Sequence, residues 1–134
     1  MNDGSSRSPE SRVRLFVYGT LMRDGRFHAP LAAQPFLGRA RSRPLYALFD
    51  LGAYPALTHE EAEGHAIEGE VYEVPGPLLD LLDRIEGAPR LFRLELIELE
   101  GDAAPVYAYF YQREPNGHPL LRDGRWDNRR AHAS

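Results

Sequence analysis

The chain has 134 residues, of which 43% are hydrophobic and 27% are charged, and its formal net charge is −4. These values describe a single globular domain with one core, and the negative charge argues against the strongly basic surface that general nucleic-acid binding requires. The chain contains no cysteine and no lysine, which excludes disulfides, thiol nucleophiles, thiolate metal sites and lysine Schiff bases.

The two ends of the chain differ from its middle. Residues 1–12 are small and polar, which predicts a disordered N-terminal tail, and residues 128–134 are expected to form a C-terminal tail. One folded domain is expected between them, over residues 13–127. No apolar run approaches the roughly 18 residues of a membrane span, and the N-terminus carries no apolar signal-peptide core. We therefore expect a cytoplasmic protein without a membrane partner, and nothing in the sequence indicates its oligomeric state.

The first predicted element is a strand over residues 14–18, RLFVY, which ends abruptly at Gly19 and Thr20. The segment GTLMRDG, residues 19–25, is predicted to be the loop that follows. A strand that stops on a small residue bares its backbone, so a ligand can approach closely. A plain tight turn would leave the same pattern, and the loop taken alone does not decide between the two.

A stripe of arginines follows in residues 38–50, which are predicted to be extended. Arg39, Arg41 and Arg43 alternate with other residues, so their guanidinium groups share one face of a strand. Such a stripe could bind phosphate. In an acidic protein it is more typical of a solvated strand face near a sheet edge.

Residues 51–57 are predicted to turn, with glycine and proline as the signals, and residues 58–65 to form a polar, acidic loop. His59 and His65 flank three glutamates in this loop. Their spacing matches no metal-ligand pattern, so we expect neither a metal site nor a cofactor.

A strand, a helix and a further strand are predicted next. In residues 66–74 the side chains alternate in the manner of a strand, and one face of that strand is polar at its start. A helix is expected to begin near Pro77 and to end before Gly87. The strand over residues 92–100 changes phase at Ile97, which predicts a β-bulge.

The last predicted strand spans residues 105–112. Tyr107, Tyr109 and Tyr111 share one of its faces, and we interpret them as packing residues rather than as a binding wall. A strand-rich chain with one clear helix predicts an α+β fold, with a small mixed β-sheet or open twisted β-barrel and flanking short helices.

Glu86 occupies an unexpected position on the predicted helix. At about 100° per residue, Glu86 lies four residues after Leu82 and seven after Leu79, within the apolar face. That face consists of Leu78, Leu79, Leu81, Leu82 and Ile85. A carboxylate directed at the core is costly unless it is bonded, paired or protonated. Either the helix end frays and Glu86 reaches water, or Glu86 is a partly buried carboxylate with a raised pKa, suited to general acid/base chemistry.

Six segments of the chain, taken together, resemble the γ-glutamylcyclotransferase-like family. They are FVYGTLM, GAYPAL, EGEVYEV, LLDRIEG, VYAYFY and a late DGRW. No single segment is specific, but all six occur in the family's order and spacing, from about residue 14 to residue 127. The resemblance implies a small mixed α+β fold, a twisted β-barrel with flanking helices.

The resemblance also implies an activity and a site. Members of the family cyclise γ-glutamyl groups and release 5-oxoproline together with an amine or an amino acid, an acyl transfer within one small molecule. Tyr18, Gly19, Thr20 and Leu21 would form the loop that holds the α-carboxylate or the carbonyl of the substrate. Glu86 would be the general acid/base, the same residue that the helical pattern singles out. No cofactor is implied.

One departure from the family pattern leaves the substrate open. Phe92 stands where relatives commonly carry a tyrosine, and Arg93 comes one residue earlier than the usual arginine. γ-Glutamylamines, γ-glutamyl amino acids and γ-glutamyl-protected intermediates are all compatible with the sequence. Two further hypotheses are a non-catalytic member of the fold that binds a small metabolite, and an interaction module that uses the arginine stripe.

Overall fold

The computed structural model describes residues 7–129, and the parts of the predicted tails at 1–6 and 130–134 lie outside the described residues. Within residues 7–129 no helix is long and apolar enough to cross a membrane. The elements are, in chain order, β1 (Arg12–Val17), the short 3-10 helix η1 (Ala29–Leu31), β2 (Phe36–Arg41), β3 (Tyr46–Asp50), β4 (Pro55–His59), β5 (Glu68–Pro75), α1 (Gly76–Ile85), β6 (Phe92–Leu96) and β7 (Tyr107–Tyr111).

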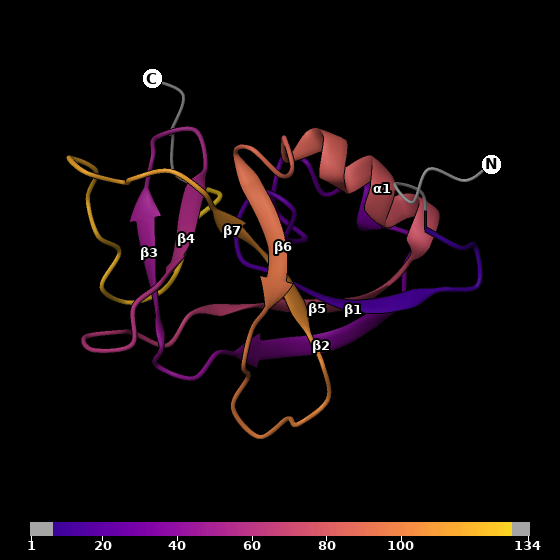
Figure 1. Ribbon diagram of the computed structural model, residues 1–134, viewed down its shortest axis with the longest axis horizontal. Helices are drawn as coiled ribbons and strands as arrows, with labels where there is room; N and C mark the ends of the chain where they lie inside the picture. Colours follow the sequence, from indigo (N-terminus) through magenta and orange to yellow (C-terminus); the bar gives the residue numbers. More distant parts are fainter. Residues whose placement is uncertain (1–6, 130–134) are drawn as a thin grey trace.

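The strands form an open five-stranded sheet and a separate hairpin of β3 and β4 (Figure 1). The strand order in the larger sheet is β2-β5-β1-β7-β6. Because β1 is antiparallel to β5 and parallel to β7, the sheet is mixed. The predicted α+β fold with a small mixed sheet is confirmed, and neither sheet closes on itself.

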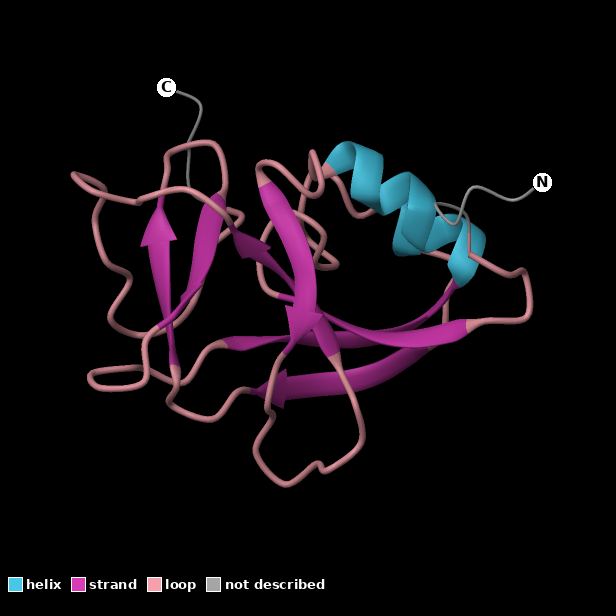
Figure 2. Cartoon of the chain, in the orientation of Figure 1, coloured by secondary structure: helices cyan, strands magenta, loops and turns pink. Residues whose placement is uncertain are grey.

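The core has two layers because both faces of the large sheet are covered. Leu15, Phe16 and Val17 of β1 are all buried, and successive side chains of a strand point to opposite faces. Leu15 and Val17 pack in the cluster that includes Leu79 and Leu82 of α1, and the helix lies along that side of the sheet (Figure 2). Phe16 belongs to the second cluster, which includes the β3–β4 hairpin.

Helix α1 has the predicted ends, but it buries a narrower stripe than its pattern predicts. A proline lies in its first turn, and Gly87 follows its end with a φ of 67°, the left-handed conformation that glycine adopts at low cost. Only Leu79 and Leu82 of its apolar stripe are fully buried, while Ile85 remains 41% exposed. Leu81, at 37%, is exposed as well, so the exposed residues lie one turn apart along one edge of the stripe.

Two predictions about local structure are wrong. The turn predicted over 51–57 ends earlier, since Pro55 opens β4, a position where a proline removes no interior ladder bond. The predicted bulge at Ile97 is absent, because β6 pairs with β7 without a register shift and ends at Leu96. The chain then turns Ile97 into the core, and its N–H donates to the Val106 carbonyl at 2.9 Å.

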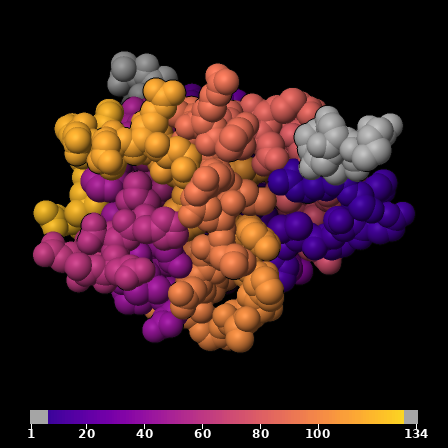
Figure 3. Space-filling model, viewed as in Figure 1, coloured from indigo at the N-terminus to yellow at the C-terminus, as the bar shows by residue number. Residues whose placement is uncertain are grey.

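The arginine stripe lies at a sheet edge, as predicted. Strand β2 is an edge of the large sheet. The Arg41 Nε lies 3.8 Å from Oε2 of Glu100, and the Arg43 Nη1 lies 3.1 Å from Oε1 of Glu98. β6 is the other edge strand, and its part of the chain crosses the visible face between the β3–β4 hairpin and the N-terminal segment (Figure 3).

Candidate active site

A cavity of about 340 Å³ opens where β1 ends and α1 ends. Its wall comes from the end of β1 and the loop that follows, the turn before β4, the last residues of α1, the start of β6, and Tyr109 of β7. All five residues that the sequence analysis expects in the active site line this one cavity, namely Tyr18, Gly19, Thr20, Leu21 and Glu86. The fold therefore brings together two segments that are 65 residues apart in the chain.

Glu86 is the C-cap residue of α1, directly after Ile85, and it lines the cavity from the helix end. Its backbone N–H still donates to the Leu82 carbonyl at 2.8 Å, so Glu86 lies one turn beyond a buried residue and on the same side of the helix. Burial raises the pKa of the Glu86 carboxyl to about 7 from its ordinary value of 4.5. Within residues 7–129 no donor is hydrogen-bonded to this carboxylate. Loss of water without replacement by donors explains the raised pKa.

The loop after β1 offers backbone donors to the cavity. In the described part of the chain, the N–H groups of Gly19, Thr20 and Leu21 make no hydrogen bond. Their carbonyls are occupied. The Gly19 carbonyl accepts from the Met22 N–H at 3.0 Å, and the Thr20 carbonyl accepts from the Phe27 N–H at 2.9 Å. A loop with engaged acceptors and unengaged donors is suited to binding an anion or a developing oxyanion.

Gly19 packs against Pro55, which gives a second reason, besides close approach of a ligand, for a glycine at this position. A Cβ built on Gly19 would lie 2.6 Å from Cγ and 2.8 Å from Cδ of Pro55. The Pro55 ring itself lines the cavity. Glycine is thus required by packing between two walls of the cavity, and a side chain there would displace Pro55.

Two tyrosines support the inner end of the cavity. The buried Tyr18 hydroxyl donates to the Tyr109 carbonyl at 2.7 Å, and the Tyr109 hydroxyl donates to Asp83 at 2.7 Å. Asp83 also pairs with Arg7 at 2.8 Å. Burial, and next the negative charge on Glu86, raise the pKa of Tyr18 well above its usual range. Both hydroxyls are therefore neutral donors, and the bonds fix the α1 end relative to β7.

Sequence reasoning missed several residues of the wall. Tyr54 and Phe92 meet edge to face, with ring centroids 5.8 Å apart, and Arg26 and Phe27 lie at the outer side of the same cavity. The sequence draws attention to Phe92 only through the tyrosine hydroxyl that it lacks. Tyr109 packs in the core, as the sequence predicts, and it also lines the cavity. No periodicity marks these residues, since they come from several segments that are far apart in the chain.

The two histidines noted in the sequence do not belong to this cavity. His59 stacks on Phe110 with ring centroids 4.2 Å apart, and its Nε2 lies 2.8 Å from Glu95. His65 donates its backbone N–H to the Tyr46 carbonyl at 2.7 Å. Among residues 7–129 no group of three or more His, Asp or Glu side chains is arranged to hold a metal ion.

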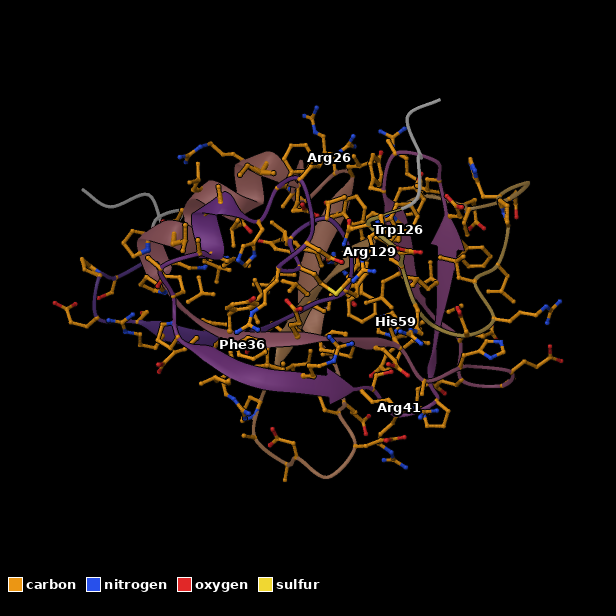
Figure 4. The ribbon with its side chains drawn as sticks, turned by 180° about the vertical axis from the view of Figure 1, so that it is seen from behind. Arg26, Phe36, Arg41, His59, Trp126 and Arg129 are labelled. Carbon is orange, nitrogen blue, oxygen red and sulfur yellow. The ribbon has the colours of Figure 1, made fainter. Side chains whose placement is uncertain are left out.

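A larger cleft of about 1080 Å³ lies elsewhere, and it is lined mostly by charged side chains. Phe36, Trp126 and Arg129 line it, and Figure 4 labels all three on the side opposite to the view of Figure 1. The cleft contains neither Glu86 nor the loop after β1. We take the smaller cavity as the candidate active site because it combines a carboxyl of raised pKa, unengaged donors and an apolar wall.

Comparison with known proteins identifies the family. The family model described as gamma-glutamyl cyclotransferase, AIG2-like, matches residues 15–128. The chain belongs to this family. It is 40% identical over 116 residues to a Vibrio cholerae protein named provisionally as a gamma-glutamylcyclotransferase, covering 86% of this chain and 96% of that protein. It is also 33% identical over 105 residues to the gamma-glutamylaminecyclotransferase of Rattus norvegicus, covering 69% of this chain and 70% of the rat enzyme.

Solved structures agree with this membership of the gamma-glutamyl cyclotransferase family. The crystal structure of a mouse AIG2-like protein aligns with a TM-score of 0.76 and 25% identity, covering 92% of this chain and 93% of the mouse chain. The solution structure of YtfP from Escherichia coli aligns with a TM-score of 0.67 and 30% identity, covering 87% and 98% of the two chains. Family membership supports an activity of the gamma-glutamylcyclotransferase type on small γ-glutamyl compounds.

Proposed function

We propose that this protein cyclises the γ-glutamyl group of a small molecule to 5-oxoproline and releases an amine or an amino acid, with Glu86 as the general acid/base. The observation that carries the proposal is the Glu86 carboxyl, whose pKa is raised to about 7, in the same cavity as the loop of Tyr18, Gly19, Thr20 and Leu21. A carboxyl with such a pKa is available both as base and as acid at neutral pH.

The first task of the site is to position the substrate. The α-amine of the γ-glutamyl group must reach its own γ-carbonyl carbon, so holding the ring-closing conformer supplies much of the acceleration. The unengaged N–H groups of Gly19, Thr20 and Leu21 are available for the substrate carboxylate or for the γ-carbonyl oxygen. Donors at that oxygen stabilise the negative charge that develops as the carbon becomes tetrahedral.

The second task is to move protons between two nitrogens. The α-amine is protonated at neutral pH and cannot attack, so the Glu86 carboxylate accepts one of its protons. The amine then forms the new C–N bond, and the γ-carbonyl carbon becomes tetrahedral. Glu86 donates its proton to the departing nitrogen as the amide C–N bond breaks. The carboxylate then accepts the extra proton of the ring nitrogen and passes it to the released amine, which returns Glu86 to its ionised form. The bond that forms and the bond that breaks share one carbon, so no external reactant is required.

The direct test is release of 5-oxoproline from a panel of γ-glutamyl amino acids and γ-glutamylamines. Glu86→Gln serves as the matched variant, because the amide keeps the shape of the carboxyl and cannot accept a proton. We expect turnover by the native protein and a loss of about 100- to 10,000-fold in the variant. Circular dichroism of both proteins checks that the fold is retained.

Two results would overturn the proposal in different ways. Near-native turnover by Glu86→Gln would exclude Glu86 as the acid/base while leaving the reaction in place. No 5-oxoproline from any substrate, with the native protein folded and with binding of γ-glutamyl compounds detected by calorimetry, would favour a non-catalytic metabolite-binding protein.

A further inference from the structure

Arg26 is the one positively charged residue in the wall of the active-site cavity, within the described chain. The other charged residue of the wall is Glu86, and the rest are neutral. Arg26 is exposed, and its guanidinium carbon lies 5.0 Å from the centroid of the Phe27 ring. Figure 4 labels it beside the end of α1, where Glu86 also lies.

The guanidinium of Arg26 is held in place without being neutralised. Its Nη2 donates to the Ala53 carbonyl at 2.9 Å, which ties the loop after β1 to the turn before β4. No acidic side chain among residues 7–129 pairs with it. A guanidinium has five N–H donors, so most of them remain available for a carboxylate.

The cavity has an inner and an outer end, and Arg26 is at the outer end. The inner wall includes Phe16 at 0% exposure and Tyr109 at 3%, whereas Phe27 at 43% and Ile85 at 41% form the rim. The γ-glutamyl carbon that reacts must lie against the partly buried Glu86. In the proposed reaction, the departing portion of the substrate would extend toward the rim, where Arg26 lines the cavity.

We propose that Arg26 recognises a carboxylate on the leaving group, so that this protein prefers γ-glutamyl amino acids to γ-glutamylamines; this rests on the proposed function. An amino acid released from its γ-glutamyl bond carries a carboxylate two bonds from the departing nitrogen. An amine has no such group, and a diamine would bring a second positive charge toward Arg26. Arg26 is a specificity residue in this scheme and takes no part in proton transfer.

The test uses two substrates that differ by one carboxylate, γ-glutamyl-L-alanine and γ-glutamylethylamine. We expect Arg26→Gln to lower kcat/KM for the alanine compound by roughly threefold to fivefold, the size typical of an exposed ion pair, with the ethylamine compound within about twofold. Gln removes the positive charge while keeping a polar side chain with N–H donors. Arg26→Lys should restore most of the preference.

Controls separate the roles that Arg26 could have. Arg113 is exposed and lies outside the cavity, and Arg113→Gln should leave both substrates unchanged. The preference should also weaken at about 0.5 M NaCl, because salt screens exposed charges. An equal fall in kcat/KM for both substrates would assign Arg26 to the γ-glutamyl carboxylate that they share and would overturn the inference. An unchanged kcat/KM for both substrates would overturn it as well. Failure of the native protein to turn over either compound would instead overturn the proposed function on which the inference rests.

Discussion

Glu70 and Glu86 are two glutamates that the fold shields from water to different extents and in different surroundings. Glu70, on β5, is 4% exposed, and one of its oxygens accepts the Arg23 backbone N–H and the Tyr72 hydroxyl, each at 3.0 Å. Glu86, at the end of α1, has no donor bonded to its carboxylate among the described residues, and burial raises its pKa to about 7.

The difference shows what turns a buried carboxylate into a candidate base. Glu70 is the more completely covered residue, and two donors replace the water that it has lost. Donors that replace water compensate a buried charge, and their absence leaves the charged form disfavoured. Glu70 is thus a hydrogen-bond acceptor at the charged cleft, and Glu86 is a carboxyl of raised pKa in the smaller cavity, as the proposed acid/base requires.

The largest expected effect is on stability at alkaline pH. The rise in the Glu86 pKa from 4.5 to about 7 means that the folded state holds a proton that the unfolded state has lost between these pH values. The stability contribution is therefore full below pH 4.5 and is lost as pH rises through 7. At pH 8 we expect the free energy of unfolding of Glu86→Gln to exceed that of the native protein by about 3 kcal/mol.

Urea unfolding at pH 4 and pH 8 measures this effect, and the gain should be absent at pH 4. Glu114→Gln is the matched control, because Glu114 is exposed. Equal stability of Glu86→Gln and native protein at both pH values would contradict the raised pKa.

The next effect is on the pH dependence of turnover. kcat/KM should fall about tenfold for each pH unit below 7, since only the ionised Glu86 accepts the proton of the amine. The midpoint for kcat should lie lower, because the bound ammonium group favours the charged carboxylate. Initial rates of 5-oxoproline release from pH 5 to pH 8 provide the measurement. A kcat/KM that does not change over this pH range would contradict the role of Glu86 as the base.

Substitution of Glu70 should affect stability and spare turnover. Glu70→Leu leaves the Tyr72 hydroxyl and the Arg23 N–H without their acceptor, and we expect a loss of about 2 kcal/mol in the free energy of unfolding. Glu70→Gln keeps an acceptor oxygen and should lose less. Denaturant curves measure both variants. Loss of 5-oxoproline release in a folded Glu70→Gln protein would show that the comparison assigns the roles wrongly.

The smallest effect concerns Asn128, which connects the C-terminal segment to the loop after β1. Its Nδ2 donates to the Gly19 carbonyl and to Asp24, each at 3.0 Å. Asn128→Ala should cost about 1 kcal/mol in unfolding free energy, because the Gly19 carbonyl keeps its bond from Met22. Asn116, exposed in a loop, provides the matched control, Asn116→Ala. A loss as small as the control's would mean that the C-terminal segment does not support the loop.

Local patterns in the sequence predicted the elements that carry the site. The position of Glu86 one turn after Leu82 follows from the helical repeat, and the helix ends follow from Pro77 and Gly87. The end of β1 before the loop follows from an apolar run that stops at a glycine. Each of these depends on neighbours within about one turn or one strand, which a linear pattern records.

Only the tertiary structure decided which of the two glutamates lacks donors. On the pattern of β5, Glu70 belongs to a polar strand start, yet the loop after β1 and Tyr72 cover it and supply hydrogen bonds. The packing of Pro55 on Gly19 and the place of Arg26 at the cavity rim likewise join segments that are far apart in the chain. The sequence by itself determined where a carboxylate would face inward. Solvation of that carboxylate depends on every segment packed around it, and no local repeat encodes that.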